Sequence, residues 1–355
     1  MNDTTLSVGS LEAQPGTKAR GTVRAELGTL TVDIPLTLVN GTRPGPRVVI
    51  TAGVHGGEFT PIDAAARLTA LLEPGEVCGQ VIICPVANPP AVYQGRLNVS
   101  PVDGVNINRV FPGDPDGSPT ERLAAWLFTH LVDGADVYID LHCGGIDQVL
   151  RDFVGYRLTG DPDLDKATAE LAGSFGIEDV ILGLKADGGN SHAAAARRGI
   201  SAVLVEVGEL GQRDGATARR RVDGLYRALR HLGVLVPRQA TDPDDCAPAP
   251  IREWVWAAGV TAEATGLWYP EFSAGDDVAQ GDVIGRIVDP ADSQAHKVLS
   301  PAGGRVFYGM HGLTVAPGSE LAAIATRWDP GQETRPATLR TPGAGVGSDE
   351  ADPRP

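Results

Sequence analysis

Residues 47–61 read RVVITAGVHGGEFTP, an apolar run that ends in glycines carrying one histidine and one carboxylate. Residues 47–53 are β-branched and apolar on consecutive positions, which is typical of a strand covered on both faces. His55 and Glu58 follow this strand directly. Either the segment is an ordinary glycine-rich turn, or it holds two ligands toward a metal ion.

Similar apolar runs recur along the chain and alternate with helical patterns. The further strand patterns are residues 80–86, 136–141 and 201–206, and the helical patterns are residues 61–72, 119–132, 163–175, 191–198 and 214–232. Thr60 and Ser118 precede a proline at two helix starts and are predicted N-caps. This alternation predicts an α/β fold with a mostly parallel mixed sheet flanked by helices. In such sheets ligands bind at the carboxyl ends of the strands.

The flanking segments have a different composition. Residues 1–19 are expected to form a flexible lead-in, and residues 21–27 and 29–39 a β-hairpin around Gly28. Residues 238–250 are rich in proline and aspartate and predict a linker. Residues 251–327 alternate in short runs and predict a small all-β domain, whereas residues 328–355 are expected to be disordered. The catalytic α/β domain is therefore predicted to span residues 20–237.

The composition narrows the class of partner. The net charge of −15 over 355 residues argues against nucleic acid and anionic membranes, because phosphates would be repelled. The first residues show no secretory signal, no stretch is apolar enough to span a bilayer, and the four cysteines have no CxxC spacing. We expect a cytoplasmic protein that acts on a small molecule. The sequence does not decide between a monomer and a homo-oligomer.

Three predicted strands end in a side chain that could bind a metal or move a proton. His55 and Glu58 follow the first strand, His142 follows residues 136–141, and Glu206 closes residues 201–206. Two histidines and one carboxylate form the ligand set of catalytic zinc sites, which keep a coordination position open. A further carboxylate would take the proton of water and give it to a leaving nitrogen. Each residue alone also has a structural interpretation, such as a hydrogen-bonded interior histidine or a helix cap.

The connection at residues 88–114, NPPAVYQGRLNVSPVDGVNINRVFPGD, is long for a compact domain. Asn108 and Arg109 place an amide beside a guanidinium, which suits the bidentate binding of a carboxylate. Arg96 offers a second guanidinium. Without the neighbouring histidines and carboxylates, this segment would be interpreted as a surface loop with solvated arginines.

Together these motifs resemble the succinylglutamate desuccinylase/aspartoacylase family of the zinc carboxypeptidase superfamily. The motifs are GxHGxE, NPxAxxxGR, DGxNxNRxFPG, DLH and VEVG, in this order over residues 47–208. The resemblance implies hydrolysis of an N-acyl amino acid to a carboxylic acid and a free amino acid. It covers most of the chain, because a small C-terminal β-domain also matches.

The resemblance also implies roles for individual residues. It makes His55, Glu58 and His142 the ligands of one zinc ion per chain and Glu206 the general base and acid. It assigns Arg96 to polarising the scissile carbonyl. It assigns Asn108 and Arg109 to the carboxylate of the substrate. Asp140 is a candidate for orienting a ligating histidine, and Glu209 stays open as the alternative base.

The C-terminal segment resembles half of a biotinyl- or lipoyl-type barrel-sandwich. A carrier domain needs a lysine at the tip of a hairpin, where this chain has Ser293. We therefore interpret the segment as a structural cap on the mouth of the site, and Tyr308 and His311 are candidates to reach the pocket. Two other functions stay open, a zinc carboxypeptidase acting on peptides and a non-catalytic binding protein with a degenerate site. The acyl group, the amino acid and the preferred metal are not determined by the sequence.

Overall fold

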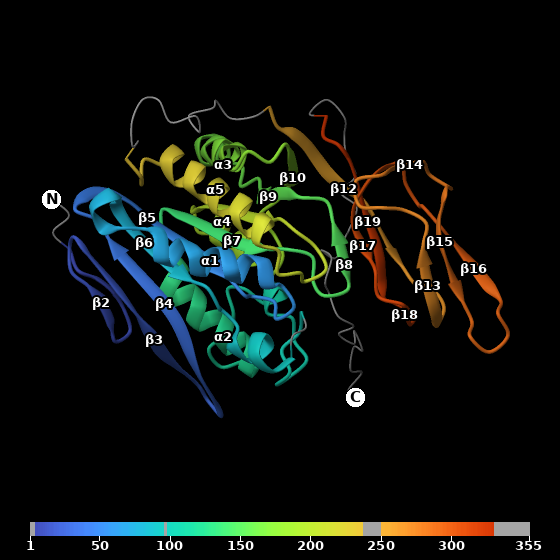
Figure 1. Cartoon of the computed structure of the whole chain (residues 1–355), viewed down its shortest axis with the longest axis horizontal. Helices are drawn as coiled ribbons and strands as arrows, with labels where there is room; N and C mark the ends of the chain where they lie inside the picture. The colour runs from blue at the N-terminus through green and yellow to red at the C-terminus, as the bar shows by residue number, and fades with distance from the viewer. Residues whose placement is uncertain (1–3, 96–97, 237–249, 330–355) are drawn as a thin grey trace, which may run out of the picture.

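The computed structural model describes residues 4–95, 98–236 and 250–329 (Figure 1). Its centre is a set of parallel strands in the order β11-β7-β5-β6, within one large mixed sheet of 13 strands among the described residues. These strands are β5 (Arg43–Ala52), β6 (Cys78–Cys84), β7 (Val137–His142) and β11 (Ser201–Glu206). Every residue of β7 is buried, as the continuous apolar runs predict for a sheet covered on both faces.

The N-terminal strands extend the sheet at one edge. The predicted hairpin around Gly28 is confirmed, because β3 (Thr17–Leu27) pairs antiparallel with β4 (Leu30–Asn40), and β4 pairs with β6. The expected lead-in is wrong in part. Residues 6–13 form a second hairpin of β1 (Leu6–Val8) and β2 (Leu11–Ala13), whose apolar side chains are buried in the core that β3 and β4 also supply.

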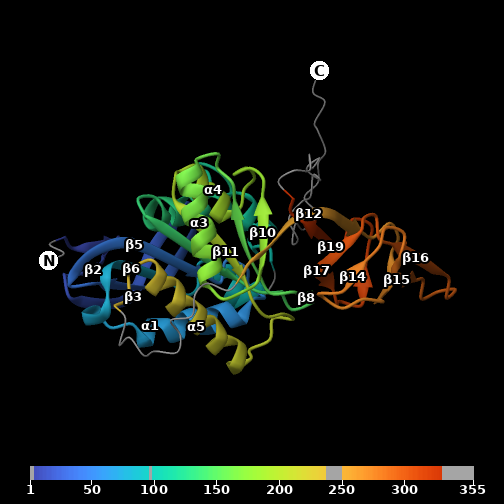
Figure 2. The ribbon, with the colours of Figure 1, turned by 90° about the horizontal axis from the view of Figure 1, so that it is seen from above.

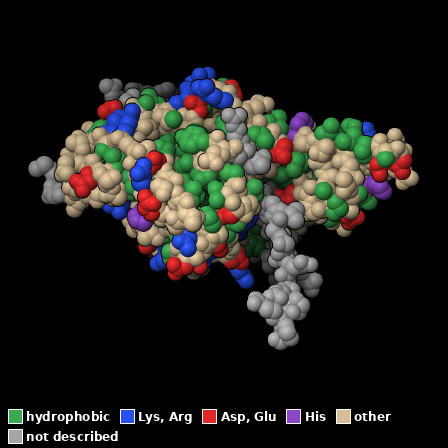
Figure 3. Space-filling view, turned by 90° about the horizontal axis from the view of Figure 1, so that it is seen from below, with side chains coloured by type: hydrophobic (Ala, Val, Ile, Leu, Met, Phe, Trp, Pro, Cys, Tyr) green, Lys and Arg blue, Asp and Glu red, His purple; other side chains and the backbone are tan. Residues whose placement is uncertain are grey.

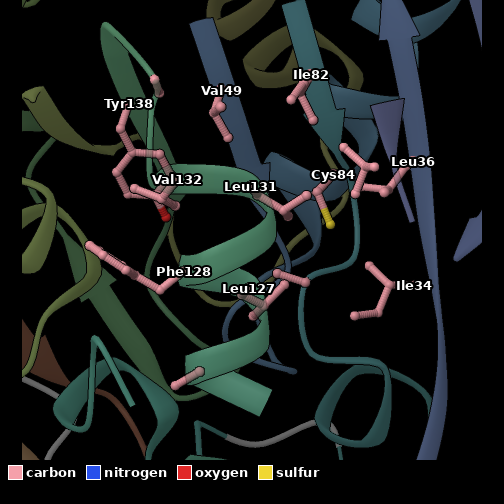
Figure 4. Packing of buried hydrophobic residues seen from close by; sticks show 14 of the residues in the cluster. Ile34, Leu36, Val49, Ile82, Cys84, Leu127, Phe128, Leu131, Val132 and Tyr138 are labelled. Carbon is pink, nitrogen blue, oxygen red and sulfur yellow. The ribbon is translucent and has the colours of Figure 1, made fainter. Parts of the chain in front are cut away.

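Helices cover both faces of the sheet. They are α1 (Phe59–Leu71), α2 (Pro119–Leu127), α3 (Pro162–Ser174), α4 (Ser191–Arg197) and α5 (Gly215–His231). Buried residues of α1, α3 and α5 share one hydrophobic core, and those of α2 and α4 share another. Short helical turns also occur at η1 (Pro74–Glu76), η2 (Ala91–Gly95), η3 (Ile107–Arg109) and η4 (Phe128–Val132). Figure 4 shows side chains of α2 and η4 packed beside residues of β4, β5, β6 and β7.

The two predicted helix starts have different outcomes. Ser118 is the N-cap of α2 and forms a full capping box with Glu121, as expected from Ser followed by Pro. Thr60 is not the N-cap of α1, because the helix begins at Phe59 with Glu58 in the cap position. The Thr60 hydroxyl instead donates to the carbonyl of Gln212, a tertiary contact that the local sequence does not reveal.

Three strands were not predicted and widen the sheet beyond β11. They are β8 (Gln148–Leu150), β9 (Phe153–Arg157) and β10 (Asp179–Gly183). Strand β9 runs antiparallel to β11 and parallel to β10, and β10 runs parallel to β12. This extension places new side chains directly beside the carboxyl end of β11.

The C-terminal segment is all β, as predicted, but it continues the large sheet. Its strands are β12 (Arg252–Thr261), β13 (Gly266–Pro270), β14 (Asp277–Val278), β15 (Val283–Val288), β16 (Ala295–Leu299), β17 (Gly304–Met310), β18 (Thr314–Val315) and β19 (Glu320–Arg327). Strands β12, β14, β17 and β19 join the large sheet, and the other four form a second sheet. Both views place these strands at one end of the molecule and β1–β3 at the other (Figures 1 and 2).

Parts of two predictions lie outside the described residues. Most of the expected linker and tail fall in residues 237–249 and 330–355. Within the described residues, no helix combines the length and apolar character needed to cross a bilayer. On the face seen from below, Lys and Arg side chains lie among Asp and Glu side chains and do not gather by sign (Figure 3).

Candidate metal centre and active site

The loop after β5 presents His55 and Glu58. Gly53 has a φ of +64°, and an added Cβ there would lie 3.1 Å from the carbonyl oxygen of Pro85, so this turn requires glycine. The chain then leads through His55 to Glu58 at the start of α1. Both side chains are buried, with 5% and 3% exposure. The glycine-rich segment is therefore an interior turn that ends a central strand.

His142 and Glu206 arrive from two neighbouring parallel strands. His142 is the last residue of β7, Glu206 is the last residue of β11, and the two are direct partners in the β-register. Strand β5 lies on the other side of β7, so its loop reaches the same edge of the sheet. The predicted convergence at the carboxyl ends of the strands is thus present in the structure.

The three proposed ligands lie within coordinating reach of one another. Their candidate donor atoms are all within 4.8 Å of each other. The Nδ1 atom of His55 lies 2.7 Å from one carboxylate oxygen of Glu58, and Nδ1 of His142 lies 2.9 Å from the other. Two imidazole nitrogens facing one buried carboxylate fit the His₂Glu donor set of catalytic zinc sites. The chemistry of the donor set therefore suits a zinc ion.

The opposite nitrogen of each histidine ring is held by a second residue. Nε2 of His142 lies 2.9 Å from Oδ2 of Asp140, and Nε2 of His55 lies 3.0 Å from Oδ1 of Asn106. Outer partners of this kind fix the orientation of a ligating histidine and leave Nδ1 for the metal. The contact of Asp140 with His142 agrees with the suggestion that Asp140 orients a histidine. Asn106 was not singled out from the sequence, although it is the first asparagine of the NxNR motif.

Asp140 is itself held in place by hydroxyl groups. The Thr51 hydroxyl donates to Oδ1 at 2.7 Å, and the Ser191 hydroxyl donates to Oδ2. Burial raises the pKa of Asp140, but the charge of His142 and these hydrogen bonds outweigh burial and lower it overall. Burial likewise raises the pKa of Glu58, but the charges of His55 and His142 and their hydrogen bonds outweigh burial and lower the pKa overall. Both carboxylates are therefore held in the ionised form.

Glu206 faces a cavity beside this cluster. Its side chain lines the cavity together with His55 and Glu58, and its Oε2 atom is buried without a hydrogen-bond partner among the described residues. Burial raises the pKa of Glu206 to about 8. The alternative base, Glu209, is exposed, and its carboxylate accepts a hydrogen bond from the backbone of Leu150. The geometry therefore favours Glu206.

The two predicted substrate-binding residues, Asn108 and Arg109, are described by the structure, whereas the predicted catalytic Arg96 is not. Asn108 is buried, its Oδ1 accepts a hydrogen bond from the Ser191 backbone, and its Nδ2 lies 3.5 Å from Nε2 of His142. Burial lowers the pKa of Arg109 to about 10, while Glu320 and Glu206 oppose this change. Neither Asn108 nor Arg109 is among the residues that line the cavity. Arg96 lies outside the described residues.

The cavity has a volume of about 60 Å³ and extends from His55 and Glu58 toward the C-terminal strands. Tyr308 of β17 lines it, as suggested, whereas His311 is exposed and does not. Several lining residues come from strands that the sequence did not predict, namely Leu150, Phe153, Gly155, Arg157, Ile181 and Gly183. His192, on α4, was also missed. A histidine among the alanines of a predicted helix was the available signal.

The comparisons with known proteins agree with this arrangement. Residues 44–232 match the succinylglutamate desuccinylase/aspartoacylase catalytic domain. The chain is 36% identical over 260 residues to an N-alpha-acetyl-L-2,4-diaminobutyric acid deacetylase of Halomonas elongata, covering 73% of this chain and 75% of that protein. It is 28% identical to a succinylglutamate desuccinylase of Paraburkholderia xenovorans, covering 52% of this chain and 56% of that protein.

A solved structure is similar over nearly the whole molecule. The crystal structure of a succinylglutamate desuccinylase/aspartoacylase from Rhodobacter sphaeroides is 30% identical, with a TM-score of 0.77, and the match covers 88% of this chain and 96% of that one. The motifs, the sheet topology and the histidine–carboxylate cluster lead to the same assignment. The chain belongs to the succinylglutamate desuccinylase/aspartoacylase family, whose members are deacylase hydrolases.

Proposed function

We propose that the protein is a zinc-dependent hydrolase that cleaves the amide bond of a small N-acyl amino acid. The observation that carries the proposal is the convergence of His55, Glu58 and His142, with Glu206 on the adjacent strand facing the same cavity. Family membership and the Halomonas deacetylase support the class of reaction. The small cavity favours a short N-acyl amino acid over a peptide.

In the proposed reaction, some residues bind the metal or the substrate and Glu206 transfers a proton. His55, Glu58 and His142 would hold the zinc ion, which supplies a Lewis acid that polarises a carbonyl and acidifies water. Glu206 takes the proton of the attacking water and delivers it to the amide nitrogen as the C–N bond breaks. The water oxygen remains on the acyl carbon, so the products are a carboxylic acid and a free amino acid. Arg96, Asn108 and Arg109 are proposed to bind the carbonyl and carboxylate oxygens.

Metal analysis and a hydrolysis panel test this function. Purified protein should contain about one zinc ion per chain and should hydrolyse at least one N-acetyl or N-succinyl amino acid. The panel includes N-acetyl-2,4-diaminobutyrate and short peptides. His55→Ala should lose the metal. A metal-free protein, or a wild-type rate in His55→Ala, would contradict the proposal.

A matched pair of variants tests the proton carrier. Glu206→Gln should keep the metal and lose about 10²- to 10⁴-fold in kcat, because general acid–base catalysis contributes about that much. Glu209→Gln, three residues along the chain, should keep wild-type activity because Glu209 is exposed and does not line the cavity. The assignment of Glu206 is wrong if the two variants exchange these outcomes.

A further inference from the structure

Beyond Glu206, the face of the sheet that forms the floor of the cavity is apolar as far as Arg157, which lies two residues after Gly155 on β9 and shares this face. In the β-register Glu206 pairs with Phe153, Leu204 pairs with Gly155, and Gly155 pairs with Ile181. Paired residues, and residues two apart on one strand, share a face of a sheet. All five of these residues line the cavity. An apolar stretch of floor therefore lies between the proposed proton carrier and Arg157.

Aromatic and aliphatic side chains close this part of the cavity. Trp256 of β12 lines it and contacts Phe153 edge to face, with ring centroids 6.0 Å apart. Leu150 and Tyr308 line it from β8 and β17. Phe153, Ile181 and Leu204 belong to one hydrophobic cluster, against which Leu150 and Trp256 pack. We call Phe153, Gly155, Ile181, Leu204 and Trp256 the apolar subsite.

The charges around the apolar subsite do not suit a positively charged group. Among the described residues that line the cavity, Glu58 and Glu206 are the acidic ones, and both already have roles in the proposed reaction. The basic residue is Arg157, whose guanidinium donates to Oδ1 of Asn190 at 3.4 Å. His192 is held neutral, because burial lowers its pKa and the charge of Arg157 lowers it further. A buried ammonium group would therefore lack a counter-charge of its own.

We propose that the apolar subsite selects substrates whose non-reacting group beside the amide is a short hydrocarbon chain. This inference rests on the proposed hydrolysis and names the class of substrate for it. A water-sized group requires about 10 to 15 Å³ of such a cavity. The 60 Å³ volume also includes the space beside His55, Glu58 and Glu206, so the apolar subsite accepts a short chain and not a long one. The hydrocarbon can belong to the amino-acid side chain or to the acyl group, and the substrate series below separate these two sources.

The first test compares substrates of equal shape and different charge. N-acetylnorvaline and N-acetyl-2,4-diaminobutyrate have side chains of the same length that end in a methyl group and an ammonium group. A parallel series on glycine extends the acyl group from acetyl to butyryl and hexanoyl, with succinyl as the anionic member. In the series that occupies the apolar subsite, kcat/KM should rise about fourfold per added methylene until the cavity is full.

The charged analogues decide the inference. If the side chain occupies the apolar subsite, norvaline should exceed diaminobutyrate at least tenfold; if the acyl group does, butyryl should exceed acetyl by about fourfold for each added methylene. A preference for the charged member, or flat values in both series, would overturn the inference and leave the proposed hydrolysis standing. If no compound is hydrolysed, the proposed function fails. Calorimetry with free norvaline, diaminobutyrate, hexanoate and succinate then still tests the apolar subsite, and weaker or equal binding of the hydrocarbons would refute it.

Gly155 allows the apolar subsite to be filled without disturbing the fold. A Cβ at Gly155 would lie 3.6 Å from the Phe153 ring and 3.7 Å from a Leu204 methyl, which are ordinary contacts. Gly155→Ala should lower kcat/KM for the preferred hydrocarbon substrate about fourfold or more, with little change for the shortest member of the same series. Gly303→Ala is the matched control, since its Cβ also meets only ordinary contacts and Gly303 does not line the cavity. Equal effects of Gly155→Ala on all chain lengths would contradict the inference.

Discussion

The contact between Asp140 and His142 predicts a measurable loss of metal affinity in Asp140→Asn. Asp140 is fully buried, and its Oδ2 lies 2.9 Å from Nε2 of His142 while Nδ1 of the same ring faces Glu58. If His142 binds zinc as proposed, an asparagine of the same shape can no longer provide the negative charge that would make His142 a stronger ligand. Its amide NH₂ group also meets the hydroxyl groups that now donate to the carboxylate.

The magnitude follows from what such outer partners contribute elsewhere. Loss of the residue that orients a ligating histidine weakens metal affinity about 10- to 100-fold, which corresponds to about 1.4 to 2.8 kcal/mol of binding free energy. Zinc affinity is measured by competition with a chelator of known affinity, independently of turnover. The fold of the variant is checked by circular dichroism before the titration.

Asp136→Asn provides the matched control for this experiment. Asp136 precedes β7, and its carboxylate accepts a hydrogen bond from the Arg47 backbone at 2.7 Å, at the opposite end of the strand from His142. The same chemical change there should leave the zinc affinity within about twofold of wild type. An unchanged affinity in Asp140→Asn, or equal losses in both variants, would refute the argument that Asp140 acts through His142.

Three further predictions address the proposed carboxylate clamp, the junction with the C-terminal strands and the strand ends. Arg109→Lys should raise KM about tenfold or more with kcat nearly unchanged, because one charge-assisted hydrogen bond to the substrate carboxylate is lost. Steady-state kinetics measures both constants, and a change confined to kcat would contradict this role. Burial raises the pKa of Asp179, but hydrogen bonds from Arg252, Arg151 and Trp254 outweigh burial and lower the pKa overall. The ionised carboxylate therefore stabilises the fold above about pH 4, and this contribution is lost as the pH falls further. Urea unfolding should therefore show Asp179→Asn less stable than wild type by about 1.5 to 3 kcal/mol at pH 7 and a smaller difference near pH 3, whereas a difference independent of pH would exclude this origin. Arg221→Leu should lose at least about 2 kcal/mol in the same assay and reduce kcat, since Arg221 donates to the carbonyls of His142, Val205 and Val207; a variant with wild-type stability would show that these bonds contribute little.

The sequence by itself determined the central strands and the residues at their ends. Continuous β-branched runs report burial on both faces, so β5, β7 and β11 could be located, and with them His55, His142 and Glu206. The cap at Ser118 could be located for a similar reason, because a capping box involves residues only three apart. These patterns can be recognised in a short window of sequence, although the burial and pairing that stabilise the strands come from segments far apart in the chain.

Only the tertiary structure decided what surrounds that cluster. Strand β9 pairs antiparallel with β11, and this choice places Phe153 beside Glu206 and builds the apolar floor. The partners of the histidine rings were likewise decided by contacts across the fold, such as that of Asn106 with His55, 51 residues apart in the sequence. Strand order depends on how separate segments bury their faces against one another, and a short sequence window does not contain that information. The sequence therefore indicated the chemistry at the strand ends, while the shape and polarity of the cavity depended on long-range pairing.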